Sequence, residues 1–332
     1  MAVSALQPAG TTDSSVTGLT GTLVGTSGTL AAAGARLPKM PGRTTTASSP
    51  DLASSLTRAA AGDFRSETFA CLRPLQRDGD LERSLAGLTL DPRLRVGAFI
   101  LDPLTGRVGS LRGDESFAAA STIKVPIAVE LLRRVDRGEI ALDEKLGLRG
   151  EDRAAGSGSL QWLPPGMSLS VRRTAEMMIR RSDNTATNMI IARLGGMDEI
   201  NARFTELGLG DTRVRNLLPD MDGTNRTSPQ DLVSILARVS SGSLLSGASR
   251  DLLFSWMRRS HVKSLLPSGL SPGAVCYNKT GDIPGALGDA GIVLLPGGRR
   301  YIAAIQVERP YNSRRANEMI RRLSKALFQQ LL

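Results

Sequence analysis

The chain has 332 residues and a net charge of +10, but it contains only one histidine and two cysteines, Cys71 and Cys276. Two cysteines exclude a disulfide scaffold and a cysteine-rich zinc site, and the single His261 excludes histidine-rich metal sites. Aromatic residues make up 4%, too few for a stacking platform that binds single-stranded nucleic acid. Because the Arg-Arg pairs are spread along the chain, we interpret the positive charge as a solvated surface, with attraction to anionic polymers as the alternative.

The first segment of the chain, residues 1–63, is predicted to be disordered, and residues 64–332 to form one globular domain. Ser, Thr, Gly, Ala and Pro dominate the first 50 residues, which therefore cannot bury enough apolar surface to fold. The uncharged stretch 14–35 is too rich in Gly and Thr for a membrane-spanning helix. No Lys or Arg precedes it, so it fits a signal peptide poorly, and an atypical export signal is the alternative.

The globular part has strand patterns at both ends and helical patterns between them. Strands are predicted over 95–102, 108–111, 274–281, 288–295 and 301–308. Helices are predicted over 121–136, 173–194 (as one helix or two), 229–239 and 312–332, the last capped by Asn312 or Ser313. This order indicates a sheet assembled from the two ends of the domain.

Three short motifs carry the chemistry: Ser121-Thr-Ile-Lys124, Ser182-Asp-Asn184 and Lys279-Thr-Gly281. If Ser121 begins a helix, Lys124 lies one turn on and on the same face, so its amine can approach the hydroxyl. Burial, nearby cations and the helix N-terminus would lower the lysine pKa and make it a usable base. A serine nucleophile with a lysine base needs no histidine.

The first motif taken alone is weak, because the chain contains a second Ser-x-x-Lys at 260–263. That copy follows Arg258-Arg259 and precedes a short segment that ends at Pro267. It opens no long apolar helix, so we interpret it as coincidental. The copy at 121–124 stands in a strand–loop–helix setting and is followed by the two other motifs.

The order of the three motifs resembles that of the penicillin-recognising serine enzymes, class A β-lactamases and penicillin-binding proteins. The flanking residues 117–126 and 182–188 agree with this likeness, as do the separations of 61 and 97 residues between motifs, the second somewhat short. The resemblance covers about 66–332. It implies an α+β fold: a five-stranded antiparallel sheet with flanking helices from about 66–120 and 270–332, and an all-helical lobe from about 121–269. The active site would lie between them.

The resemblance also implies roles for the motif residues. Ser121 would be the nucleophile and Lys124 its base, while Ser182 would relay a proton to the leaving nitrogen with electrostatic support from Lys279. The expected substrate-binding residues are Asn184, Thr280, Gly281 and Asp282. Among these, Asn184 would position Lys124 or the substrate amide, and Thr280 would hold the substrate carboxylate. The backbone N–H groups of Ser121 and Asp282 would form the oxyanion hole. Asp183 is expected to be structural.

Two features depart from the class A pattern. The family's deacylation glutamate should lie on a loop that falls here at 211–227, yet this shortened segment contains no glutamate. The replacement carboxylates are Asp220 and Asp222, which are more simply read as solvated turn residues around Gly223. The stretch 283–292 also lacks the arginine with which many class A enzymes bind the substrate carboxylate. Losing a positioned general base slows a reaction by roughly 10² to 10⁴, so acylation followed by slow hydrolysis is expected.

The sequence therefore favours a serine acyl-transfer hydrolase that is acylated by β-lactams and acts on peptidoglycan D-Ala-D-Ala stem peptides. It most resembles small penicillin-binding proteins whose short loop lacks the glutamate. The alternatives are a genuine β-lactamase with another deacylation route, an esterase or amidase, and a non-catalytic wall-binding module. The resemblance implies no cofactor, no metal and a monomer, and the composition argues against a specific nucleic acid partner and a transmembrane span. The implied substrate indicates the cell envelope, whereas the lack of a clear signal peptide argues the other way. Pairing of Cys71 with Cys276 is left open.

Overall fold

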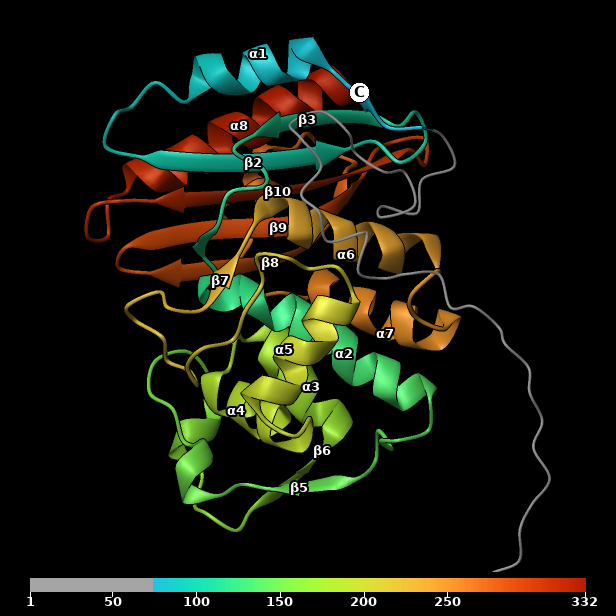
Figure 1. Ribbon diagram of the computed structural model, residues 1–332, viewed down its shortest axis with the longest axis vertical. Coiled ribbons are helices and arrows are strands. Elements are labelled where there is room, and N and C mark those ends of the chain that lie inside the picture. Colours follow the sequence, from blue (N-terminus) through green and yellow to red (C-terminus); the bar gives the residue numbers. More distant parts are fainter. Residues whose placement is uncertain (1–73) are drawn as a thin grey trace, which may run out of the picture. The chain divides into compact units, whose positions relative to one another are not determined.

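A six-stranded sheet runs through residues 74–332, the part of the chain that the computed structural model describes (Figure 1). Its strand order is β1-β3-β2-β10-β9-β8. The strands are β1 (Gln76–Arg77), β2 (Arg95–Leu101), β3 (Arg107–Leu111), β8 (Val275–Ile283), β9 (Ala286–Leu294) and β10 (Arg300–Glu308). The five expected antiparallel strands are all present, and the two-residue β1 adds a parallel sixth strand beside β3.

The sheet is buried on both faces, which explains why its central strands are apolar without clear alternation. In β2, Ala98 and Ile100 face one hydrophobic core, whereas Phe99 and Leu101 face the other. Successive side chains of a strand point to opposite faces, so a strand covered on both sides needs apolar residues at consecutive positions.

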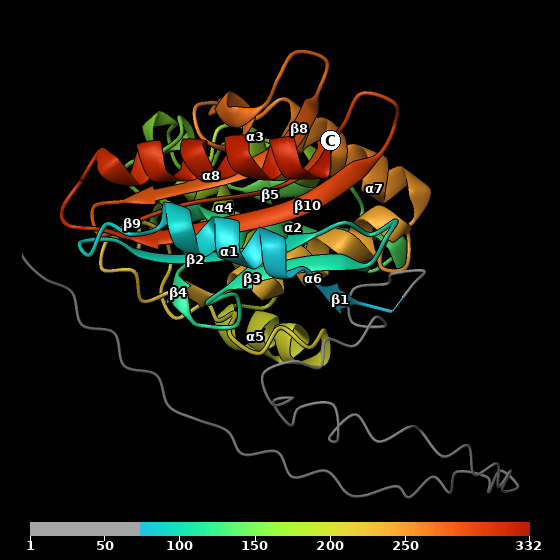
Figure 2. The ribbon, with the colours of Figure 1, turned by 90° about the horizontal axis from the view of Figure 1, so that it is seen from above.

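Helices from the two ends of the described part of the chain cover one face of the sheet. They are α1 (Gly79–Leu88) and α8 (Arg315–Leu331), which lie over the sheet in the view of Figure 2. Asp78 caps α1, but α8 begins at Arg315 with Arg314 as a cap residue that makes no side-chain capping bond. The predicted cap of α8 at Asn312 or Ser313 is therefore wrong. Asn312 itself has a left-handed backbone (φ 51°), which belongs to the turn that precedes the helix.

The opposite face of the sheet is covered by α6 (Pro229–Ser241), which packs against β2, β9 and β10 (Figure 1). Ser228 caps α6, and Pro229 occupies its first turn, as predicted. The family resemblance assigns this segment to the helical lobe. Its apolar face also completes the core beneath the sheet, because Leu232, Ile235 and Leu236 are buried there.

Beyond α6, a group of helices packs around α2 (Lys124–Asp136). These helices are α3 (Val171–Arg180), α4 (Asn184–Arg193), α5 (Met197–Glu206) and α7 (Gly247–Arg258). The first nine residues of α2 are all buried, which is the pattern of a central helix surrounded by others. The predicted segment 173–194 forms two helices, α3 and α4.

Two short ribbons complete the described part of the chain: β4 (Phe117–Ala118) with β7 (Arg226–Thr227), and β5 (Lys145–Gly147) with β6 (Ser168–Ser170). The predictions for residues 1–63, and for Cys71, lie outside the described residues. Cys276 is buried as a free thiol. No helix within residues 74–332 is long and apolar enough to cross a membrane.

Candidate active site

Ser121 lies on a tight turn that leads into α2. The turn is a short 3₁₀ helix, Ala120–Ile123, so the α-helix itself starts at Lys124, and the backbone N–H of Lys124 donates to the carbonyl oxygen of Ser121. Ala120 has a left-handed backbone with φ of 44°, which is rare for a residue with a side chain and typical of strained functional turns. Gln306 on β10 anchors the turn by donating to the Thr122 hydroxyl at 2.9 Å.

The end of β8 lies directly against this turn. A Cβ atom added at Gly281 would stand 2.8 Å from the backbone nitrogen of Ser121 and 2.9 Å from the carbonyl oxygen of Ala119. Only glycine fits a backbone approach this close. The third motif therefore brings the N–H of Ser121 beside the Gly281–Asp282 segment, where the predicted oxyanion hole would be.

The amine of Lys124 is fully buried and bound by the second motif. It lies 2.6 Å from the carbonyl oxygen of Ser182, 3.1 Å from the Ser182 Oγ and 2.8 Å from the Asn184 Oδ1. Ser182 adopts a left-handed backbone (φ 55°) between α3 and α4, which turns both its carbonyl and its hydroxyl toward Lys124. The predicted association of the first two motifs is thus present in the structure.

Lys279 joins the same cluster from β8. Its Nζ donates to the Ser182 Oγ at 3.0 Å and to the carbonyl oxygen of Thr280 at 2.6 Å. The hydroxyl of Ser182 therefore lies between two lysine amines, one from each side of the site. Ser182 and Lys279 follow Ser121 by 61 and 158 positions in the sequence. They meet here because the helices pack against the sheet (Figure 1).

Both lysines have lowered pKa values. Burial is the main cause of the shift that takes the pKa of Lys124 well below its usual range, and the neighbouring charge of Lys279 adds to it, while Asp183 opposes it. Burial lowers the pKa of Lys279 to about 7 against the opposing charge of Asp289. A buried lysine whose ammonium form gives up its proton so readily can exchange protons near neutral pH.

The Asp183 carboxylate accepts hydrogen bonds from backbone N–H groups of two segments next to the site. Its Oδ1 accepts from the N–H of Ala186 and caps α4, and its Oδ2 accepts from Ser159 and Leu160 at 2.7 and 2.9 Å. These bonds hold the loop before α3 against α4. Asn184 extends the same contact by donating to the carbonyl oxygen of Ala155. The structural role expected for Asp183 matches these contacts.

The two aspartates that the sequence offered as replacement carboxylates in the shortened segment 211–227, Asp220 and Asp222, differ in their surroundings. Asp220 is buried, and its carboxylate accepts from the N–H groups of Thr224 and Asn225 and from the Thr224 hydroxyl. All of its bonds hold one turn. Asp222 is exposed and directly precedes Gly223.

Hydrogen bonds to α4 fix the backbone of Leu218, which lies in the same segment. Its N–H donates to the Asn188 Oδ1 at 2.9 Å, and its carbonyl oxygen accepts from the Asn188 Nδ2 at 2.8 Å. Asn188 stands one helical turn after Asn184, whose Oδ1 binds the Lys124 amine. The backbone of Leu218 is therefore bound one helical turn along α4 from the residue that binds the Lys124 amine.

Arg309 is a residue of the site region that sequence reasoning missed. It follows β10, its side chain is 3% exposed, and it binds the carboxylate of Asp282 and the carbonyl oxygen of Ile283. No motif surrounds it, so the sequence held no signal of its position. The stretch 283–292 provides no arginine, and a guanidinium reaches the end of β8 from another strand instead.

The second Ser-x-x-Lys copy has no part in this cluster. Lys263 donates to the Asn278 Oδ1 at 2.8 Å, behind β8, and Ser260 is buried just after α7. Within residues 74–332, no group of three or more His, Cys, Asp or Glu side chains is arranged to hold a metal ion.

Comparisons with known proteins agree with this geometry. A family model described as "Beta-lactamase enzyme family" matches residues 80–331. A β-lactamase of Streptomyces fradiae is 28% identical over 244 residues, which cover 70% of this chain and 80% of the relative. The solved structure of PBP-A is 43% identical with a TM-score of 0.77, covering 78% of this chain and 98% of PBP-A.

Two further solved structures show the same likeness. A mutant of PBP-A, solved as its acyl-enzyme complex with penicillin G, is 43% identical with a TM-score of 0.77 and covers 78% of this chain and 99% of that one. A β-lactamase from Sphaerobacter thermophilus is 27% identical with a TM-score of 0.69, covering 76% of this chain and 97% of that one.

Proposed function

The chain belongs to the beta-lactamase enzyme family of serine hydrolases, and from this premise we propose that it is a penicillin-binding D-Ala-D-Ala peptidase that deacylates slowly. In this proposal β-lactams and peptidoglycan stem peptides acylate the same serine, Ser121. The acyl-enzyme made from a β-lactam then persists, because the shortened segment 211–227 supplies no glutamate to activate the hydrolytic water.

Acylation would begin at Lys124. As a cation its amine uses three hydrogens on Ser182 and Asn184, whereas the neutral amine keeps two hydrogens and gains a lone pair. The lowered pKa favours the neutral form, which can take the proton of the Ser121 hydroxyl as its oxygen attacks the substrate carbonyl. The N–H groups of Ser121 and Asp282 would stabilise the oxyanion that forms.

Collapse of the tetrahedral intermediate requires a proton on the leaving nitrogen. The Ser182 hydroxyl, 3.1 Å from the Lys124 amine, can donate its proton to that nitrogen and recover one from Lys124. This transfer breaks the C–N bond, leaves the acyl group on Ser121 and returns Lys124 to its neutral form. Lys279 and Thr280 would meanwhile hold the carboxylate at the far end of the leaving group.

The observation that carries the proposal is the absence of a glutamate from segment 211–227. Asp220 accepts three hydrogen bonds within its own turn, and the residue of the segment whose backbone N–H donates to Asn188 of α4 is Leu218. Loss of a positioned base slows hydrolysis by roughly 10² to 10⁴. The 43% identity to PBP-A, a mutant of which was solved as a penicillin acyl-enzyme, supports this direction.

Intact mass spectrometry after mixing penicillin G with equimolar protein tests the proposal. A persistent adduct on Ser121, absent from Ser121→Ala, is the expected result. Rapid conversion of the penicillin to free penicilloate would instead make the protein a true β-lactamase. Release of D-alanine from an acyl-D-Ala-D-Ala peptide, measured with the same two proteins, tests the peptidase activity. No adduct and no D-alanine release would refute both parts.

A further inference from the structure

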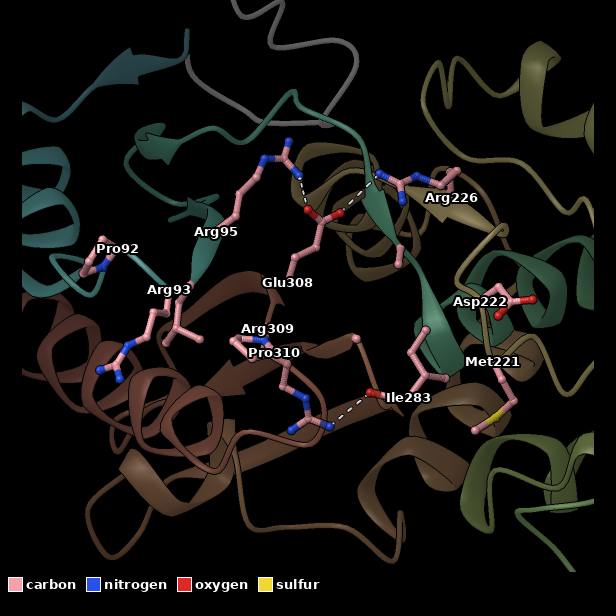
Figure 3. A pocket seen from close by; sticks show the side chains of 13 residues that line it. Pro92, Arg93, Arg95, Met221, Asp222, Arg226, Ile283, Glu308, Arg309 and Pro310 are labelled. Atoms are coloured by element: carbon pink, nitrogen blue, oxygen red, sulfur yellow. Dashed lines mark hydrogen bonds and ion pairs between the residues drawn. The ribbon is translucent and has the colours of Figure 1, made fainter.

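Charged side chains gather in two places next to β8. Near the end of the strand, a cavity of about 480 Å³ is lined in part by Arg95, Arg226, Glu308 and Asp222 (Figure 3). Both guanidinium groups bind the carboxylate of Glu308, and these three side chains are between 24% and 38% exposed, so water screens their charges. A charge that acts strongly on the lysine cluster must be buried, and groups of this kind lie behind β8.

The buried groups behind β8 form a hydrogen-bonded chain that starts at Lys263. The Lys263 amine donates to the Asn278 Oδ1 at 2.8 Å, and the Asn278 Nδ2 donates to the two carboxylate oxygens of Asp289 at 3.0 and 3.1 Å. Asn278 and Asp289 are fully buried, whereas Lys263 is half-buried. Lys263 is the lysine of the second Ser-x-x-Lys copy, for which the catalytic cluster has no use.

The hydrogen bonds that reach the Asp289 carboxylate come from neutral groups. Besides the Asn278 amide, the N–H of Leu266 donates to the Asp289 Oδ2 at 3.0 Å. Burial raises the pKa of the Asp289 carboxyl to about 7, against these hydrogen bonds and the charges of Lys279 and Lys263. Near neutral pH the charged form of Asp289 therefore depends on two lysines, which come from different parts of the chain.

Lys279 lies one residue along the sheet from this carboxylate. β8 and β9 pair so that Asp289 stands opposite Thr280, and the Lys279 amine bends along the strand to donate to the Thr280 carbonyl oxygen. Consecutive residues of a strand point to opposite faces, so the Lys279 amine joins Ser182 and Lys124 in front of β8 while Asp289 lies behind it. The charges of Lys279 and Asp289 thus act on each other through a buried sheet, where the effective dielectric constant is lower than in water.

Other buried titratable groups on the elements around β8 and β9 do not replace Asp289 in this role. Cys276 on β8 and Tyr301 on β10 are neutral, because burial raises the pKa of each. Asp231, at the start of α6, interacts with residues 211–213 instead. The residues of α8 that pack on the sheet are uncharged. Asp289 is the group whose charge opposes the lowering of the Lys279 pKa.

We infer that Lys263, acting through Asn278 and Asp289, is a positioning residue that keeps Lys279 protonated for acylation. The ammonium group of Lys263 polarises the Asn278 amide and favours the carboxylate form of Asp289. That carboxylate favours the ammonium form of Lys279, which holds the substrate carboxylate in the proposed mechanism. The effect on acylation rests on the proposed function, whereas the effect on the charge of Lys279 does not.

An NMR titration of lysine side chains tests this inference without using activity. The chain has only six lysines, so protein labelled with ¹³C-lysine gives few signals, and the Cε signal of Lys279 is assigned by its loss in Lys279→Arg. Lys263→Met removes the distant cation, Lys263→Arg keeps it, and Asp289→Asn removes the carboxylate. Lys145→Met, at the exposed start of β5, removes the same charge elsewhere and is the matched control.

Loss of an opposite charge lowers the pKa of an amine, so the Lys279 titration midpoint should fall by about 1 in Asp289→Asn and about 0.5 in Lys263→Met. The midpoint should stay at the wild-type value in Lys145→Met and be largely restored in Lys263→Arg. A folded Lys263→Met protein with the wild-type midpoint would overturn the inference, as would an equal decrease in Lys145→Met. Because Lys263 is only half-buried, its variants give the answer even if Asp289→Asn does not fold.

The pH profile of acylation by penicillin G separates the inference from the proposed function. Since Lys279 loses its charge as pH rises, a lower midpoint means that the acylation rate constant of Lys263→Met should start to fall at lower pH than that of the wild type. A fall that does not follow the NMR midpoint would overturn the role of Lys263 in acylation. A wild-type protein that is not acylated at any pH would refute the proposed function, while the NMR titration would still show whether Lys263 controls the charge of Lys279.

Discussion

Replacing Leu218 with glutamate should convert a long-lived acyl-enzyme into a short-lived one. The N–H and carbonyl of Leu218 are fixed by the side chain of Asn188, one helical turn of about 5–6 Å from Asn184. Since the Asn184 Oδ1 is 2.8 Å from the Lys124 amine, a carboxylate on the side chain of residue 218 would reach the vicinity of the acylated serine. There it could activate a water molecule.

The expected gain is the rate that a positioned general base supplies, roughly 10²- to 10⁴-fold in deacylation. The substitution also has a cost, because Leu218 is 6% exposed and a buried carboxylate must replace its packing. We expect a loss of about 1–3 kcal/mol in the free energy of unfolding, reduced if the new carboxylate pairs with the lysine cluster.

The lifetime of the penicillin G adduct, followed by intact mass after removal of free penicillin, measures the effect. Leu217→Glu is the matched control, because the Leu217 side chain is 42% exposed and a glutamate there would direct its charge into solvent. Thermal unfolding establishes that both variants fold. A folded Leu218→Glu protein whose adduct is as stable as that of the wild type would refute the reasoning, as would equal acceleration in Leu217→Glu.

Three further predictions concern the lysine cluster, the β8 contact and a buried carboxyl. Because the pKa of Lys279 is about 7, its charge is lost as pH rises, so the acylation rate constant of the free protein should fall above pH 7, and Lys279→Arg should abolish that fall in a pH profile. In Gly281→Ala the new Cβ atom would stand 2.8 Å from the Ser121 nitrogen, so acylation should slow at least tenfold. In Gly285→Ala the new Cβ atom has open space around it, so acylation should not slow. Equal acylation rates in the two variants would contradict the close contact at Gly281. Burial raises the pKa of Asp231 to about 7, so its proton is bound more tightly in the folded state and stability is lost as pH rises from about 4 to 7. In urea unfolding, Asp231→Asn should therefore gain about 1–4 kcal/mol relative to the wild type between pH 4 and pH 8, and a constant difference would contradict the shift.

The secondary structure was largely predictable because the core segments carry local signals. The five antiparallel strands follow from apolar runs bounded by Gly and Pro, and α6 begins at a Ser-Pro pair that caps and opens a helix. The first residue of α8 was not predictable in this way. Asn312 is a good helix cap by residue type, but packing placed it in a left-handed turn and moved the helix start to Arg315.

The candidate site also has residues that the sequence predicted and residues whose surroundings only the fold revealed. Motif order and the strand–loop–helix setting of the first motif predicted Ser121, Lys124, Ser182 and Lys279 as site residues, since a serine–lysine mechanism needs those residue types and the family keeps them in that order. It could not distinguish Asp220 from Asp222. Their separation came from the fold, where one carboxylate is used by the turn 220–225 and the other lies exposed beside a cavity.

The sequence by itself determined the type of chemistry, a serine nucleophile without a histidine, because that information lies in residue identity and order. Only the tertiary structure decided which groups act on one another. Arg309 reaches Asp282 from the end of β10, and Leu218 reaches α4 through Asn188, although no local pattern marks either contact. Such contacts depend on how distant segments pack, since hydrogen bonding and charge pairing act over a few ångströms in space, whatever the separation along the chain.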